Sequence, residues 1–118
     1  MNRRKCGLKL LVAGAALTAL PGPVSAASQY PTDAASIASG RELAEIHCAT
    51  CHAVGSEDAS AQPLAPAFRF LGRRYPISSL EESLAEGIVT GHDGMPEFAF
   101  EPEDIDAFLG YLTSIQKD

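Results

Sequence analysis

Cysteine, lysine and long apolar runs are scarce in this sequence, and their scarcity narrows the function classes open to it. The 118 residues include only three cysteines, so a zinc site made of two separated cysteine pairs has too few ligands. The main apolar run, from Leu8 to Leu20, falls well short of the ~20 residues that a helix needs to cross a bilayer. No nucleophile with an acid–base pair is visible, which argues against an enzyme.

The first 26 residues have the features of a secretory signal peptide. Basic residues at positions 3–5 precede the apolar run, Pro21 breaks it, and Val24-Ser25-Ala26 supplies a small-x-small cleavage pattern. Cys6 lies before the run and is not placed as a lipoprotein cysteine. An uncleaved membrane anchor is the alternative. We expect export to the periplasm, removal of residues 1–26 and no stable membrane insertion afterwards.

Little positive charge remains once that segment is removed. Four of the nine lysines and arginines lie within it, whereas all 15 acidic residues follow it, which leaves a net charge of −10. Such a chain repels nucleic acid and anionic lipid and is steered toward basic protein surfaces. We therefore expect no nucleic-acid partner, and protein partners with basic docking faces.

The stretch that carries the clearest chemistry is Cys48-Ala49-Thr50-Cys51-His52. Cys-x-x-Cys-His is the attachment motif of c-type haem. Residues three apart lie on one face of a helical turn, so both sulfurs can reach the two vinyl groups of one porphyrin. The histidine that follows projects toward the iron, a role that imidazole fills in many haem proteins. The motif predicts one covalent haem c bound through Cys48 and Cys51, with His52 as iron ligand.

Two other uses of Cys-x-x-Cys need a context that this sequence does not supply. A redox dithiol of the thioredoxin kind is typical of a βαβ unit, and no strand longer than a few residues is predicted here. Half of a zinc site needs two more ligands at a similar spacing. A second Cys-x-x-Cys-His does not occur, so a single haem is expected.

Apolar periodicity predicts helices. Apolar residues recur at three- and four-residue steps from about Ser36 into Cys48. Leu80, Leu84 and Ile88 mark one face of a second helix, which is expected to end near Gly87 to Gly91. A last helix opens with Pro102 in its first turn and buries a stripe of apolar residues: Ile105, Phe108, Leu109 and Leu112. The expected fold class is all-α.

The connections between these helices complete the domain plan. Glycines and prolines make residues 53–67 a loop, and Gly91-His92-Asp93-Gly94-Met95-Pro96 cannot be regular structure. Residues 27–35 are expected to be a flexible N-terminal segment. The domain itself is expected over residues 36–118.

This order of elements resembles the class I cytochromes c, and a bacterial subgroup more than the lysine-rich mitochondrial protein. The resemblance covers nearly all of residues 36–116. It implies three to four helices around one covalently attached haem, with crossed N- and C-terminal helices. It also implies thioether bonds at Cys48 and Cys51 and iron ligation by His52 and Met95. Met95 is the only methionine that remains after the signal peptide.

A smaller match concerns the helix crossing. Gly40 lies eight residues before Cys48, where the family packs its first helix closely against an aromatic residue of the last. The absence of a Cβ permits that approach. Tyr111 or Phe108 would be the partner, and Tyr111 fits the family pattern better.

Another match concerns the proximal side of the haem. Pro66 with Phe68 resembles the proline and following apolar residue that the family places there, although Pro63 is a rival for the proline. A backbone carbonyl at this point would accept the Nδ1 proton of His52 and fix the ring.

The distal ligand has two alternatives to Met95. Methionine can be an ordinary packing residue, and His92, three residues earlier, could replace it or titrate near the haem. A third histidine, His47, is expected to point outward, away from the haem.

The haem surroundings are expected to include arginine and apolar side chains. Arg69, Arg73 and Arg74 either supply a partner for a haem propionate, with Arg69 as our candidate, or form a solvated basic patch. The residues expected to line an apolar pocket are Leu64, Phe68, Phe70, Ile88 and Phe98.

Histidine and methionine on the two faces of the haem would leave no open site for a substrate, which favours one-electron transfer. We therefore expect a monomeric, mobile carrier between periplasmic redox proteins. A haem subunit of a larger periplasmic oxidoreductase and a gas-binding or sensory haem protein are the alternatives.

Overall fold

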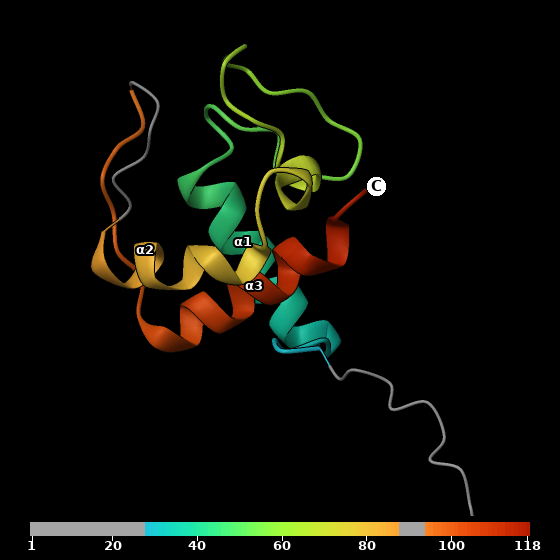
Figure 1. Ribbon diagram of the computed structural model, residues 1–118, viewed down its shortest axis with the longest axis vertical. Helices are drawn as coiled ribbons and strands as arrows, with labels where there is room; N and C mark the ends of the chain where they lie inside the picture. The colour runs from blue at the N-terminus through green and yellow to red at the C-terminus, as the bar shows by residue number, and fades with distance from the viewer. Residues whose placement is uncertain (1–27, 88–93) are drawn as a thin grey trace, which may run out of the picture.

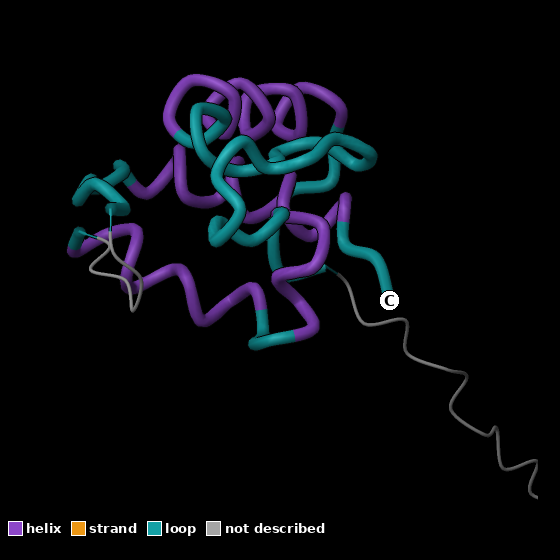
Figure 2. The backbone as a smooth tube through the Cα atoms, turned by 90° about the horizontal axis from the view of Figure 1, so that it is seen from above, coloured by secondary structure: helices purple, strands orange, loops and turns teal. Residues whose placement is uncertain are grey.

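The computed structural model describes residues 28–87 and 94–118. Within these ranges the chain is helical and contains no strand, as the purple and teal tube of Figure 2 shows. The all-α prediction is therefore confirmed. No helix of the described part is long and apolar enough to cross a membrane. The elements in chain order are α1 (Ala34–His47), the 3₁₀ helices η1 (Phe68–Arg73) and η2 (Ile77–Ser79), α2 (Leu80–Glu86) and α3 (Pro102–Ile115).

The N-terminal end of the domain lies earlier than the sequence predicts. Asp33 caps α1, because its Oδ1 accepts a hydrogen bond from the backbone N–H of Ser36 at 3.0 Å. Tyr30 is buried in the core and donates to Glu81 Oε2 at 3.2 Å. Within the segment predicted to be flexible, the chain from Tyr30 onward therefore packs on the helical domain or caps its first helix.

α1 and α3 cross closely, as Figure 1 shows. Gly40 makes this approach possible: a Cβ added there would lie 2.0 Å from Ala107 O and 2.8 Å from Tyr111 Cβ. No side chain fits at that distance, so the backbones of the two helices meet where α1 has none. The predicted packing of Gly40 against Tyr111 is confirmed.

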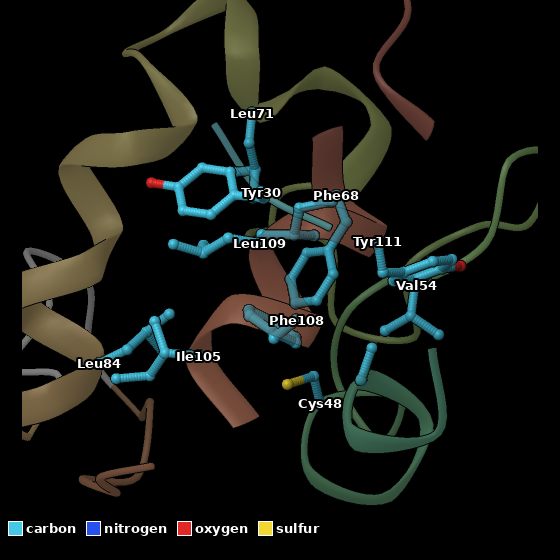
Figure 3. Packing of buried hydrophobic residues seen from close by; sticks show 12 residues of the cluster. Tyr30, Cys48, Val54, Phe68, Leu71, Leu84, Ile105, Phe108, Leu109 and Tyr111 are labelled. Atoms are coloured by element: carbon cyan, nitrogen blue, oxygen red, sulfur yellow. The ribbon is translucent and has the colours of Figure 1, made fainter. Parts of the chain in front are cut away.

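The core lies against one face of α3. The predicted stripe, Ile105, Phe108, Leu109 and Leu112, is buried. Figure 3 shows Phe108 and Leu109 in one cluster with Phe68 of η1, while Leu84 of α2 meets Ile105. Burial of such side chains supplies the main driving force for folding, and here it joins all the major helices through α3.

Hydrogen bonds attach η1 to the end of α3. The Gln116 side chain donates from Nε2 to Phe68 O at 2.9 Å, and its Oε1 accepts from the N–H of Gly72 at 2.7 Å. The N–H of Lys117 donates to Arg69 O at 2.8 Å. The chain that leads away from the Cys-x-x-Cys-His motif is thereby held to the C-terminal helix.

Candidate functional site

The end of α1 presents the Cys-x-x-Cys-His motif on a continued turn. The N–H of Cys48 donates to Ala44 O at 2.9 Å, and the N–H groups of Cys51 and His52 donate to Cys48 O at 3.1 and 2.9 Å. The two cysteines are not joined in a disulfide. Cys48 is buried, and burial raises the pKa of its thiol to about 11. The turn brings two sulfurs and an imidazole to one place.

These side chains line a cavity of about 680 Å³. Its wall combines the end of α1, the loop after the motif and the segment that contains Met95. The residues of the wall are His47, Cys48, Thr50, Cys51, His52, Gln62, Pro63, Leu64, Ala65, Gly94, Met95, Pro96 and Phe98. All four predicted sulfur and imidazole groups therefore face one space.

The His52 ring has a defined orientation. Its Nδ1 lies 2.8 Å from Pro66 O, and because a carbonyl oxygen only accepts, Nδ1 carries the proton. The lone pair is then on Nε2, the atom that a metal would need. The Phe68 ring lies 5.0 Å from the His52 ring, between it and Phe108. Phe68 thus supports the histidine from the core and is not part of the cavity wall.

The backbone on both sides of His52 is tied to the loop that follows it. Cys51 O accepts from the N–H of Gln62 at 3.1 Å, and the buried N–H of Ala53 donates to Ser60 Oγ at 2.9 Å. Ala53 O in turn accepts from the N–H of Phe68 at 2.9 Å. This ladder brings Pro66 back beside the His52 ring, although Pro66 is 14 residues away in sequence.

Met95 reaches the cavity from the C-terminal half of the sequence, whereas the Cys-x-x-Cys-His motif lies in the N-terminal half. Its side chain is half-buried, and its segment is anchored nearby by a hydrogen bond from the N–H of Phe100 to Leu84 O at 2.8 Å. Glu97 of the same segment lies against Gly87, which has a φ of 100° and ends α2. The rival His92 lies outside the described residues.

Arg69 and Phe70 do not line the cavity. Arg69 Nη1 lies 3.4 Å from Asp58 Oδ1 and 3.5 Å from Gly55 O. The Phe70 ring lies against two guanidinium groups, 4.7 Å from that of Arg69 and 4.4 Å from that of Arg73. The expectation that Phe70 contributes to an apolar pocket is therefore wrong, because η1 turns this ring toward arginines. Pairing of Arg69 with a haem propionate stays a prediction.

Other expected pocket residues have mixed outcomes. Leu64 and Phe98 line the cavity as expected, and Ile88 lies outside the described residues. His47 was expected to point away, yet its exposed side chain is part of the cavity wall and stacks on Phe98. The sequence carries no local signal for this contact, because the two residues lie about fifty positions apart.

The cavity fits a haem. Its volume lies within the ~300–1,000 Å³ of typical cofactor sites. Leu64 on its wall is 90% exposed, so a large apolar side chain faces the space that an apolar ring would occupy. Two thiols can form thioether bonds to the vinyl groups of a haem, and an imidazole with a methionine sulfur is a known donor set for haem iron.

Comparison with known proteins decides the family. The family model described as "Cytochrome C oxidase, cbb3-type, subunit III" matches residues 35–112, which is most of the domain. The chain belongs to the cytochrome c family. It is also 37% identical over 90 residues to cytochrome c-552 of Bradyrhizobium diazoefficiens, and the match covers 74% of this chain and 85% of the relative. No solved structure matches it significantly.

Membership in the cytochrome c family has direct consequences for the chain. Its cofactor is covalent haem c, and its kind of activity is electron transfer, not the catalysis of a substrate reaction. The predicted cofactor and the prediction of a carrier rather than an enzyme are thereby confirmed.

Proposed function

We propose that this cytochrome c is a periplasmic one-electron carrier whose iron is ligated by His52 and Met95. Thioether bonds to Cys48 and Cys51 would attach the haem. The observation that supports this most strongly is that these four side chains, from both halves of the sequence, line one cavity. When bound, the haem supplies an iron that changes between the ferrous and ferric states.

The surrounding residues make that iron suited to electron transfer. The hydrogen bond from His52 Nδ1 to Pro66 O holds the imidazole in one orientation, which limits rearrangement between oxidation states. A thioether ligand and an apolar wall containing Leu64 and Phe98 both favour the ferrous state and raise the reduction potential. With both His52 and Met95 bound to it, the iron would have no position left for a substrate.

The proposed partners are redox proteins with basic docking faces. Exposed carboxylates cluster where α3 begins, at Glu101, Glu103 and Asp104, and the chain after residue 26 has a net charge of −10. Opposite charge speeds the encounter of such proteins without requiring a large interface. Export is part of the proposal, with residues 1–26 as the signal peptide. The exported chain is proposed to be a monomer with its cytochrome domain over residues 36–118. The residues from Tyr30 onward pack on that domain.

The test of this function is the spectrum of the exported protein in both redox states. Haem that stays attached after denaturation and a ferric charge-transfer band of an iron–sulfur bond are expected. Met95→Ala should remove that band, lower the reduction potential and allow carbon monoxide to bind the reduced iron. A five-coordinate iron in the wild-type protein, or a spectrum that Met95→Ala leaves unchanged, would refute the proposed ligation.

The second candidate is a haem subunit of a larger periplasmic oxidoreductase, and the description of the matching family model as an oxidase subunit favours it. The same ligands would serve in that setting. The two candidates differ in solution behaviour: a carrier migrates as a monomer and exchanges partners rapidly, whereas a subunit copurifies with a fixed complex from its native membrane extract.

A further inference from the structure

His47 is a cavity-wall residue that has no role in the proposed ligand set. It is the last residue of α1 and directly precedes Cys48. Its ring meets two phenylalanine rings of the segment that contains Met95. The centroids of His47 and Phe98 are 6.3 Å apart with the planes at 22°, and those of His47 and Phe100 are 5.3 Å apart at 64°.

These ring contacts join the Met95 segment to α1. The other described anchors of the segment lead elsewhere: the Phe100 N–H bonds to Leu84 O of α2, and the Phe100 ring packs edge-on against Phe108 of α3 at 5.6 Å. Stacked and edge-to-face arrangements are the favoured geometries of aromatic pairs, so the contacts define how the segment lies against α1. His47 therefore connects α1, which leads into the Cys-x-x-Cys-His turn, to the Met95 segment.

We propose that His47 is a positioning residue for Met95. By stacking on Phe98, three residues after the methionine, it holds the thioether sulfur where it can bind the iron of a haem attached through Cys48 and Cys51. The inference rests on the proposed function, because it requires Met95 to be the distal ligand. The His47 ring contacts Phe98 and Phe100, and it is through these contacts that it would position Met95.

The test uses His47→Ala in the exported, haem-loaded protein, with imidazole as the added ligand. Loss of two aromatic contacts should weaken the hold on Met95, and the affinity of the ferric protein for imidazole should rise roughly tenfold. The ferric iron–sulfur band should weaken in parallel. Ile46→Ala is the matched control, since Ile46 is the neighbouring residue of α1, is 65% exposed and is not part of the cavity wall.

Three further variants separate the ring contact from other effects of the substitution. His47→Phe keeps a ring but removes the ionisable group, so it should restore the band and the low imidazole affinity. Phe98→Leu and the double variant with His47→Ala complete a thermodynamic cycle, and their effects should be less than additive if the two residues act through one contact.

The outcomes are distinct. If the wild type has the iron–sulfur band and His47→Ala weakens it no more than Ile46→Ala does, the role of His47 is overturned while ligation by Met95 stands. Additive effects in the cycle would have the same meaning. A wild-type protein without that band would refute ligation by Met95, and the role of His47 with it.

Discussion

Gly40 of α1 lies so close to Ala107 of α3 that a Cβ on the glycine would come within 2.0 Å of the Ala107 carbonyl oxygen. The contact is with backbone, which cannot rotate away as a side chain can. The crossing of the two terminal helices, and with it the position of the Cys-x-x-Cys-His turn, therefore depends on the absence of one methyl group.

Gly40→Ala should destabilise the protein by about 2 kcal/mol, because the cost of overpacking exceeds the ~1 kcal/mol that alanine gains over glycine in a helix. Denaturant unfolding of the haem-loaded protein measures this. Gly110→Ala is the comparison: its Cβ would lie 2.5 Å from Pro31 O, which belongs to a segment outside any helix, so no helical hydrogen bonds hold the opposing backbone. If Gly40→Ala lowers the free energy of unfolding by no more than Gly110→Ala does, the close crossing of α1 and α3 is contradicted.

Ser60→Ala should cost about 1–3 kcal/mol, since it leaves the buried N–H of Ala53 without its 2.9 Å acceptor. Because Ala53 directly follows His52, the reduction potential should shift as well. Ser56→Ala, on an exposed part of the same loop, is the control and should change neither quantity. Thermal unfolding and potentiometric titration provide the two measurements. If Ser60→Ala is as stable as Ser56→Ala, the hydrogen bond from Ala53 to Ser60 does not stabilise the protein.

Tyr30 should make stability fall at alkaline pH. Burial, followed by the hydrogen bond to Glu81, raises the pKa of Tyr30 to about 12 from an ordinary value of 10.0. The folded state therefore favours the neutral phenol. Its stabilisation is complete below the unfolded pKa and is lost as the pH rises through the folded pKa.

The measurement for Tyr30 is the difference in unfolding free energy between the wild type and Tyr30→Phe. We expect that difference to shrink between pH 10 and pH 12 and to be constant at lower pH. Absorbance titration should also lose its last-ionising tyrosine in the variant. A difference that does not change across this range would show that Tyr30 is not buried against Glu81.

Replacement of both Cys48 and Cys51 by alanine should abolish covalent haem, because the remaining cysteine, Cys6, lies in the proposed signal peptide. Haem staining of the denatured protein on a gel provides the measurement. Cys51→Ala alone is the control and should retain a single bond through Cys48. Stained protein from the double variant would defeat the assignment.

Local patterns in the sequence were enough to predict the class of the fold and the chemistry of the site. The spacing of Cys48, Cys51 and His52 is set within one helical turn, and the apolar stripe of α3 follows helical periodicity. Gly40 and Met95 were identified through resemblance to a family. In each case the relevant information lies within a few residues, or in the order of elements along the chain.

The tertiary structure alone decided which distant residues meet. The Arg69 guanidinium turned to Asp58, and Phe70 came to lie between arginines, because η1 is attached to the end of α3. Tyr30 lies in the core because the folded chain brings it beside Glu81, which is 51 residues away in sequence. The contact of His47 with Phe98 depends on how α1 crosses α3, and no local preference encodes a distance between segments that are far apart in the chain.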